Sequence, residues 1–438
     1  MRVPMVLALA LTAASVTGAS AQTRQPSTES LIYDLKNPDA PRRLDAARDL
    51  GLAKTVSAIP ALLPLTEDPD SQVRRQVGVT LEQMNDITVL PGLVRLTADA
   101  EPDIRERSVQ ALVNLHLPRP TGPTAALVKL GSLINPWSDQ HAETIVEPDV
   151  PVDASVVTAL RARMADSEDR IRRDASHGLG ILRGDAAIPE LLLAIGQDRD
   201  PLVRFEAVRA LRKIGDASIG DRLVPMLNIN VDRVRTELIL TLGTLKYPGA
   251  VPEITRIYEE SKPADRIRTL ALSALADIGD PASRPVFEAN KDDKDATIRL
   301  YANEGLARLA DRSFGTVMSA DRLVEKNARV QSAQAFGLLR IGRQEYMEEL
   351  VRALGKPATR ELAREYLLET QATERPALFA MQPKSADARA ELADVLGLMG
   401  DQGALPALQA MQHDADTTVA RNAERSIRRL TASPQRFD

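Results

Sequence analysis

The side chains best suited to acid–base or metal chemistry are the histidines, and their spacing supports neither. His116, His141, His177 and His413 lie far apart, and none is followed by glutamate. His177 falls on an outward position of a predicted helix, which indicates a surface residue. The sequence contains no zinc-protease motif, no phosphate-binding P-loop and no serine-nucleophile elbow. Cysteine is absent, which excludes disulfides, thiolate metal sites and a cysteine nucleophile. We therefore predict no catalytic residue, no cofactor and no metal site.

The composition narrows the classes of partner. The 438 residues include 56 Lys and Arg against 61 Asp and Glu, a net charge of −5, and only 3% are aromatic. A mildly acidic chain with few aromatic side chains lacks the basic surface and the stacking platforms of nucleic-acid binders. No stretch beyond the first residues is long and apolar enough to span a bilayer. We expect protein partners, no nucleic acid and no stable membrane insertion.

The first residues have the pattern of a secretory signal peptide, assigned to residues 1–21. Arg2 is the only charge, Val6–Ala14 is a short apolar run, and Ala19-Ser20-Ala21 has the small-x-small form of a cleavage site. The apolar run is well under the ~20 residues that cross a membrane. The sequence predicts export to the periplasm or the extracellular space. A flexible lead-in is expected at residues 22–30 and a tail at residues 433–438.

A helical pattern recurs about every 31 residues. In the segment 200–215, Val203, Ala207, Leu211 and Ile214 fall on one face of an amphipathic helix. The second half of each interval begins with an apolar residue and often proline, as in Ile188-Pro189, and proline suits the first turn of a helix. One helix pair is too small to bury its apolar faces alone, so the pairs must stack. We predict an all-α fold, an α-solenoid of about thirteen repeats over residues 31–432, with the handedness left open.

The repeat resembles a known family. The pattern Asp-x-x-Val-Arg-x-x-Ala-x-x-Ala-Leu-x-x-Ile-Gly-Asp resembles the HEAT repeat, specifically the short type first noted in phycobilisome lyases. The residues that match, with the first displaced by one, are Asp200, Val203, Arg204, Ala207, Ala210, Leu211, Ile214, Gly215 and Asp216. The resemblance implies an armadillo-like right-handed superhelix whose concave groove holds another macromolecule. It also implies that second helices line the inner face, where Tyr258, Tyr346 and Phe379 either form a sparse apolar groove or replace leucine in the core.

An arginine occupies the same position in most repeats, and we interpret these residues as a structural ladder. Its predicted members are Arg74, Arg105, Arg172, Arg204, Arg235, Arg268 and Arg299. Asp70, Asp200 and Asp295 each precede an arginine by four residues, where an aspartate can cap the first helical turn. The arginine can pair with that aspartate or with one of a neighbouring repeat, and the resemblance implies that the ladder joins successive repeats. An anion-binding ladder is the functional alternative.

One interval is irregular. Arg105 and Arg172 are 67 residues apart, which indicates a hidden, degenerate unit at residues 118–153. We predict a first helix at residues 135–148, a proline-rich turn at 147–153 and a second helix near 154–165. The unit contains the single tryptophan, Trp137, with Asp139 and His141 nearby, and these three are the candidate partner-binding residues. The alternative is that Trp137 fills space left by an irregular turn.

Together these features predict an exported, non-catalytic scaffold or adaptor, monomeric, that binds protein partners on the solenoid surface. Two alternatives remain. One is an enzyme that resembles the bilin lyases or isomerases sharing this repeat, and the other is a purely structural module of the cell envelope. A bound tetrapyrrole would give the purified protein visible absorbance, which distinguishes the enzyme from both other cases.

Overall fold

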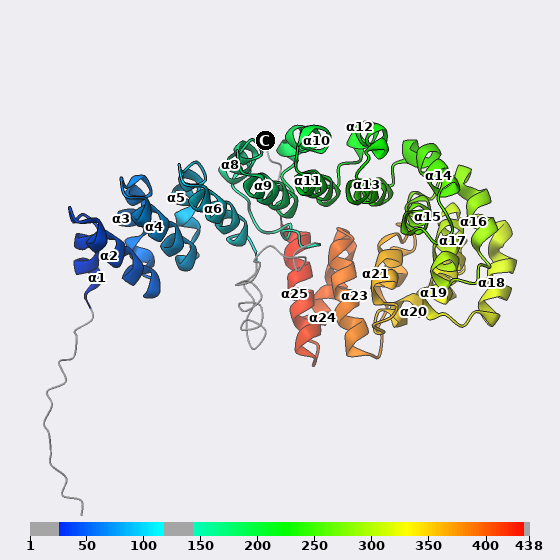
Figure 1. Cartoon of the computed structure of the whole chain (residues 1–438). Helices are drawn as coiled ribbons and strands as arrows, with labels where there is room; N and C mark the ends of the chain where they lie inside the picture. The colour runs from blue at the N-terminus through cyan, green and yellow to red at the C-terminus, as the bar shows by residue number, and fades with distance from the viewer. Residues whose placement is uncertain (1–25, 118–142, 433–438) are drawn as a thin grey trace, which may run out of the picture. The chain divides into compact units, whose positions relative to one another are not determined.

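The computed structural model describes residues 26–117 and 143–432, and these residues form helices and turns with no strand. The helices stack in pairs, which confirms the predicted all-α solenoid (Figure 1). The contacts divide the chain into two compact units, residues 1–84 and 85–438, which are described separately below as unit 1 and unit 2. The predicted signal peptide and tail lie outside the described residues.

Unit 1 contains α1, α2 and α4, with an interrupted second helix between the last two. Ser27 caps α1 by accepting a hydrogen bond from the backbone N–H of Ser30 (3.2 Å), so residues 28–30 of the expected lead-in are helical. The proline at the start of η2 lies where a helical N–H has no partner. The elements are α1 (Thr28–Asp34), α2 (Ala40–Leu52), η1 (Val56–Ala58), α3 (Ile59–Leu62), η2 (Leu63–Glu67) and α4 (Ser71–Met84).

Unit 2 alternates first helices, which begin close to a ladder position, with shorter second helices. The first helices are α6 (Pro102–Asn114), α9 (Asp169–Ile181), α11 (Pro201–Ile214), α13 (Asp232–Thr244), α15 (Arg266–Ile278), α17 (Ala296–Leu309), α19 (Ala328–Arg340), α21 (Arg360–Leu368), α23 (Ala386–Leu398) and α25 (Thr417–Thr431). The second helices are α5 (Leu90–Leu96), α8 (Ala154–Arg163), α10 (Ile188–Gln197), α12 (Gly220–Leu223), α14 (Val251–Glu260), α16 (Arg284–Asn290), α18 (Gly315–Val324), α20 (Glu345–Ala353), α22 (Arg375–Phe379) and α24 (Leu405–Met411).

Short 3₁₀ turns lead into several second helices of unit 2, and aspartates cap both kinds of element. The 3₁₀ turns that precede second helices are η3 (Ile87–Val89), η5 (Asp185–Ala187), η6 (Ala217–Ile219), η8 (Pro248–Ala250), η9 (Pro281–Ser283), η10 (Arg312–Phe314) and η11 (Gln402–Ala404). One more, η7 (Val224–Asn228), follows α12. Asp200 caps α11 by accepting from the N–H groups of Leu202 (2.6 Å) and Val203 (3.3 Å). Asp70 and Asp295 cap α4 and α17 in the same way, so the predicted capping is confirmed.

The first helices of unit 2 pack tightly against one another. A Cβ added to Gly180 of α9 would lie 2.7 Å from Cα of Ala210 on α11, and one on Gly243 of α13 would lie 2.8 Å from Cα of Ala274 on α15. Only glycine allows the backbones to approach this closely. In Figure 1, α9, α11 and α13 lie on the side that faces α21, α23 and α25, with α8, α10 and α12 behind them. The inner face is therefore formed by first helices, which differs from the arrangement that the resemblance implies.

The aromatic residues of the second helices belong to the core rather than to an inner groove. Tyr258 is buried, and its hydroxyl donates to Oδ1 of Asn290 (3.0 Å). Tyr346 and Phe379 are partly buried and pack against the apolar cluster of the C-terminal repeats. These three side chains therefore pack in or against the core, as the second of the two interpretations expected.

The segment 143–153 is not helical and crosses the interior of unit 2. Its backbone N–H at Val146 donates to the carbonyl of Ile181 on α9 (2.8 Å). The Glu147 carboxylate pairs with Arg429 on α25 (2.6 Å), 282 residues further along the chain. The prediction of a helix at 135–148 is therefore wrong for residues 143–148, since this stretch is extended to make these contacts. The second helix predicted near 154–165 is confirmed as α8.

The apolar stripe of α11 predicts unequal effects of one substitution at two positions. Leu211 is fully buried, whereas Leu202 in the first turn is 38% exposed. Leu211→Asp should lower the free energy of unfolding by at least about 3 kcal/mol, because it buries a charge that has no partner. Leu202→Asp should change it by at most about 0.5 kcal/mol, since an acidic residue suits a helix N-terminus. Urea denaturation followed by circular dichroism measures both, and equal losses would contradict the assigned faces.

Candidate functional site

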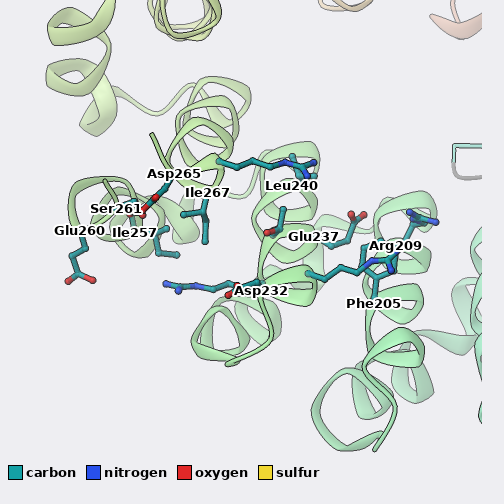
Figure 2. Close-up of a pocket in the computed structure, with 14 residues that line it drawn as sticks. Phe205, Arg209, Asp232, Glu237, Leu240, Ile257, Glu260, Ser261, Asp265 and Ile267 are labelled. Carbon is teal, nitrogen blue, oxygen red and sulfur yellow. Dashed lines mark hydrogen bonds between the residues drawn. The ribbon is translucent and has the colours of Figure 1, made fainter. Parts of the chain in front are cut away.

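A surface cavity of about 1090 Å³ lies where α11, α13, α14 and α15 meet, and we call it the α11–α15 groove. Figure 2 shows that its wall combines side chains from all four helices. Phe205 comes from α11, Leu240 from α13, Ile257 from α14 and Ile267 from α15. Charged residues surround these apolar groups, namely Arg209, Asp232, Arg233, Arg235, Glu237, Glu260, Asp265 and Arg266.

The acidic residues of the groove are largely engaged within the chain. Glu237 pairs with Arg212 (2.9 Å). Glu260 pairs with Arg256 (2.5 Å), and Asp265 accepts a hydrogen bond from the backbone N–H of Lys262 (3.0 Å). These contacts reduce the negative potential that the three carboxylates direct into the groove.

The arginines of the groove are less engaged. The guanidinium groups of Arg209 and Arg233 lie 4.5 and 4.0 Å from the centre of the Phe205 ring, in cation–π contact. Arg209 also pairs with Glu206 (3.2 Å), whereas Arg233 has no carboxylate partner among the described residues. The side chain of Arg235 forms neither an ion pair nor a hydrogen bond within the described part of the chain, and its Nε atom is buried without an acceptor. A buried donor that lacks an acceptor is costly. The Nε atom of Arg209 is also buried without an acceptor, but the Arg209 side chain is held by Glu206, whereas the Arg235 side chain has no such partner in the described chain.

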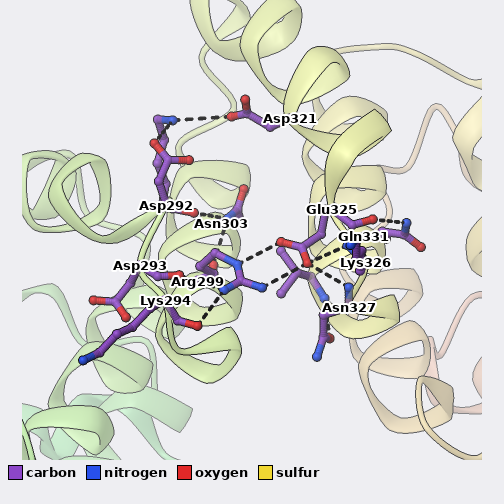
Figure 3. Close-up of polar contacts among 12 residues, drawn as sticks. Asp292, Asp293, Lys294, Arg299, Asn303, Asp321, Glu325, Lys326, Asn327 and Gln331 are labelled. Carbon is purple, nitrogen blue, oxygen red and sulfur yellow. Dashed lines mark hydrogen bonds and ion pairs between the residues drawn. The ribbon is translucent and has the colours of Figure 1, made fainter.

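The role of Arg235 follows from its counterparts in other repeats, one of which is drawn in Figure 3. Arg299 donates from Nη1 to the carbonyl oxygens of Asp293 (2.7 Å) and Lys294 (3.1 Å) in its own turn. Its Nε and Nη2 atoms bind both carboxylate oxygens of Glu325 in the next repeat, at 2.9 and 3.0 Å. The arginine thus ties the turn of one repeat to the turn of the following one by a bidentate ion pair.

The same bidentate pair recurs along the chain. It joins Arg43 to Asp68, Arg105 to Asp166, Arg172 to Asp198 and Arg389 to Asp414, with Nε–oxygen distances of 2.6–2.8 Å. In each case the acid lies six residues before the ladder position of the next repeat. The hydrogen bonds that Arg172 donates to Asp198 raise the pKa of Arg172, and burial of the pair only partly opposes this effect. Arginine therefore pairs with the neighbouring repeat, which was one of the two pairings considered from the sequence.

The ladder is interrupted in the repeats that form the groove. By the six-residue rule, the acid for Arg204 would stand at Ile229 and the acid for Arg235 at Lys262. Arg204 compensates by donating from Nε to the carbonyl of Ile195 (2.8 Å). At the position where an acid would pair with Arg235, the chain has the basic residue Lys262.

The next ladder residue, Arg268, also lacks a carboxylate partner among the described residues. Its Nη1 atom donates to the Tyr258 carbonyl (2.5 Å), and its guanidinium lies 3.8 Å from the centre of the Tyr258 ring. Within the ranges 26–117 and 143–432, the three consecutive ladder arginines Arg204, Arg235 and Arg268 therefore make no ion pair, and Arg235 lines the groove.

The site residues predicted from the sequence divide into two groups. Arg74 donates from Nη1 to the carbonyl of Asp68 (2.8 Å), the other ladder arginines are placed as described above, and Arg235 alone of them lines the groove. Trp137, Asp139 and His141 lie outside the described residues, so their role in partner binding stays a prediction. Phe205, Arg209, Arg233 and Arg266 were not predicted as site residues. The missing acids at positions 229 and 262 are the sequence signal that could have revealed the site.

One histidine is placed differently from its prediction. His177 is only 6% exposed, and its Nδ1 atom lies 3.0 Å from Oε2 of Glu206. The outward position on α9 faces the interior of unit 2 instead of solvent, because the first helices form the inner face. His177 is therefore a buried partner of Glu206.

A second charged cluster joins α15, α17 and α21 around two buried residues, Glu304 and Arg308. Arg308 on α17 contacts Asp277 (3.5 Å), Glu365 (2.7 Å) and Glu369 (3.0 Å), and Glu369 also binds Lys246 (2.8 Å). Burial raises the pKa of Glu304, beside Arg308, to about 8, and burial also raises the pKa of Asp277. The Tyr366 hydroxyl donates a hydrogen bond to Glu304. Every member has a partner within the chain, so this cluster is structural.

No group of three or more His, Asp or Glu residues suited to a metal ion occurs in the ranges 26–117 and 143–432. Over the same ranges, the helices are all too short or too polar to cross a membrane.

The ladder predicts a difference between two arginine truncations. Arg172→Ala leaves Asp198, whose side chain is 8% exposed, without its partner and should cost about 3 kcal/mol of unfolding free energy. Arg235→Ala removes no ion pair and should cost at most about 1 kcal/mol. Thermal denaturation of both variants at one pH provides the comparison. An equal loss would show that Arg235 is paired in solution.

The buried cluster predicts a pH dependence of stability. Because Glu304 in the folded chain holds its proton to a higher pH than in the unfolded chain, the free energy of unfolding should fall as pH rises from about 4.5 to about 8. Glu304→Gln keeps an acceptor for Tyr366 and removes this contribution, whose slope is at most roughly 1.4 kcal/mol per pH unit. The difference in melting temperature between variant and unsubstituted protein should therefore grow with pH over this range. A constant difference would mean that Glu304 titrates normally.

Comparison with known proteins gives partial relatives. The chain is 32% identical over 94 residues to the bilin biosynthesis protein PecE of Mastigocladus laminosus, covering 22% of this chain and 35% of that protein. It is 32% identical over 104 residues to PecE of Nostoc sp. strain PCC 7120, covering 22% of this chain and 41% of that protein. The chain thus spans less than half the length of these curated relatives.

Solved structures resemble the chain over most of its length but at low similarity. An engineered protein has 18% identity and a TM-score of 0.40, covering 92% of this chain and 98% of its own. A structure reported for the phosphorylation switch between cadherin and beta-catenin has 11% identity and a TM-score of 0.40, covering 92% and 99%.

The family is established by the sequence match to a family model. The model described as HEAT repeats matches residues 28–113, 157–239 and 220–307, together more than half of the chain. The matched ranges include the interrupted part of the ladder and both sides of the α11–α15 groove. This chain belongs to the HEAT-repeat family.

Proposed function

We propose that this protein is an exported, monomeric and non-catalytic scaffold that binds protein partners in the α11–α15 groove. The observation that carries the proposal is the unsatisfied Arg235 at the wall of a large surface cavity. At Arg172 and Arg299 the ladder arginine is bound by a carboxylate of the next repeat, and Arg204 and Arg268, which lack such a carboxylate in the described chain, donate to backbone carbonyls instead. Of these three arginines, Arg235 alone makes no side-chain hydrogen bond within the described residues, so it offers a position for an external ligand.

The shape and chemistry of the groove support a protein ligand. The partly exposed side chains of Leu240 and Ile267 offer apolar contact, while Arg233 and Arg266 are exposed at the edge of the groove. A segment of a partner can bury one side chain against the apolar wall and place polar groups on the arginines. Aromatic and arginine residues are the types that contribute most to binding energy at protein interfaces.

The partial similarity to PecE favours a second candidate, a protein that binds or modifies a bilin. A tetrapyrrole has a large apolar ring system and carboxylate groups, which the arginines of the groove could bind. Incubation with biliverdin followed by gel filtration tests this candidate. A shifted visible absorbance that elutes with the protein would favour it, and a colourless protein fraction would favour the scaffold.

The proposed site can be tested with a photo-crosslinking amino acid in place of Arg266, which is exposed at the groove. Arg222 on α12 is equally exposed and lies on a second helix, so the same label there is a matched control. Partners should be captured from position 266 and not from position 222. Binding of a purified partner should then weaken at least about tenfold in Arg233→Glu/Arg266→Glu and remain unchanged in Arg222→Glu. A larger effect of Arg222→Glu would place the partner on another face.

A further inference from the structure

We infer that the partner inserts an aspartate or glutamate of an extended acidic segment into the α11–α15 groove, where its carboxylate completes the ladder at Arg235. This inference rests on the proposed function and specifies the chemistry of the ligand. The carboxylate would occupy the place that the acid of the next repeat takes at every intact step.

The geometry of the intact steps defines that place. At Arg172 and at Arg299, the Nε and Nη2 atoms each bind one oxygen of a single carboxylate, at distances of 2.7–3.0 Å. Arg235 stands at the same position of its repeat, and its buried Nε atom has no acceptor. A planar guanidinium with a free Nε edge matches a carboxylate with two hydrogen bonds, which a single carbonyl oxygen cannot provide.

Among the described residues, the repeat that follows Arg235 does not supply the missing acid. Lys262 stands at the acid position, and the preceding residue, Ser261, donates its hydroxyl to the carbonyl of Ile257 (2.6 Å). Glu253 attracts Arg235 electrostatically but is bound by Arg256 (2.5 Å). A carboxylate at Arg235 therefore has to come from outside these repeats.

The rest of the groove favours an acidic peptide over a polyanion such as a nucleic acid. Asp232, Glu260 and Asp265 line the walls, and the whole chain has a net charge of −5. A nucleic acid would bring several phosphates close to these carboxylates, and like charges repel. A peptide needs to bring only one carboxylate into the groove, at Arg235. The partly exposed side chains of Leu240 and Ile267 suit the side chain of a neighbouring residue in a peptide.

The decisive variant restores the ladder. Lys262→Asp places an acid six residues before Arg268, as in the intact steps, and should pair with Arg235 inside the chain. The probes are short fluorescein-labelled peptides of Gly, Ser, Leu and Asp, compared with peptides in which Asn replaces every Asp. The unsubstituted protein should bind the Asp peptides at least about tenfold more tightly than the Asn peptides, as measured by fluorescence anisotropy. Lys262→Asp should raise the melting temperature and lose this preference.

Lys262→Ala is the matched control, because it removes the lysine without adding a carboxylate, and it should retain the preference for Asp peptides. Arg235→Gln gives a second route to the same answer if Lys262→Asp fails to fold, and it should abolish the preference. Equal binding of Asp and Asn peptides would overturn the inference while leaving the groove as a protein-binding site. Tighter binding of a single-stranded RNA than of the Asp peptides would also overturn it. Absence of binding by any peptide, together with no crosslink from position 266, would refute the proposed function itself.

Discussion

The structure depends on one constraint: no helix pair of this chain can bury its apolar stripe except against the next pair. The stripe of α11 shows this, since Val203, Ala207 and Leu211 are almost completely buried between neighbouring repeats. Glycines on the first helices let the backbones approach closely enough for these small apolar side chains to pack against the next repeat. Stacking therefore has to continue along the chain, and whatever fixes the position of one pair on the next fixes the path of the whole solenoid.

The arginine–carboxylate ladder supplies that positioning. Apolar contact alone is non-directional, whereas a bidentate ion pair combined with two hydrogen bonds to the preceding turn fixes both distance and orientation. The carboxylates of these pairs are mostly buried. A ladder arginine that lacks its acid therefore differs clearly from the paired arginines of the other repeats. Arg235 is such an arginine and lines the groove. There the guanidinium is left without a carboxylate of its own repeats, and we propose that a ligand binds it.

The repeat, the capping aspartates and the existence of the ladder could all be predicted from the sequence, because each is a local pattern that recurs. The path that the helices of unit 2 follow could not be predicted from the sequence. Lys246 meets Glu369 across 123 residues and Glu147 meets Arg429 across 282, and such contacts depend on small rotations that accumulate from repeat to repeat. For the same reason His177, which the helical pattern placed outward, is buried.

The candidate site could have been found in part from the sequence. Ile229 and Lys262 break the regular series of acids six residues before each ladder position, and this break is visible without a structure. The cavity beside Arg235 is not visible in the sequence, because its shape depends on how four helices are placed relative to one another. The extended form of residues 143–148 was missed because it is set by partners on α9, α11 and α25 rather than by the local pattern.

The central claim is that Arg235 is a ladder arginine whose acid comes from a partner. A crystal structure of the protein with a bound acidic peptide tests this most directly. The account predicts one carboxylate of the peptide in bidentate contact with Nε and Nη2 of Arg235, in the arrangement that Glu325 adopts on Arg299. A peptide bound elsewhere, or Arg235 paired with a carboxylate of its own chain, would contradict it.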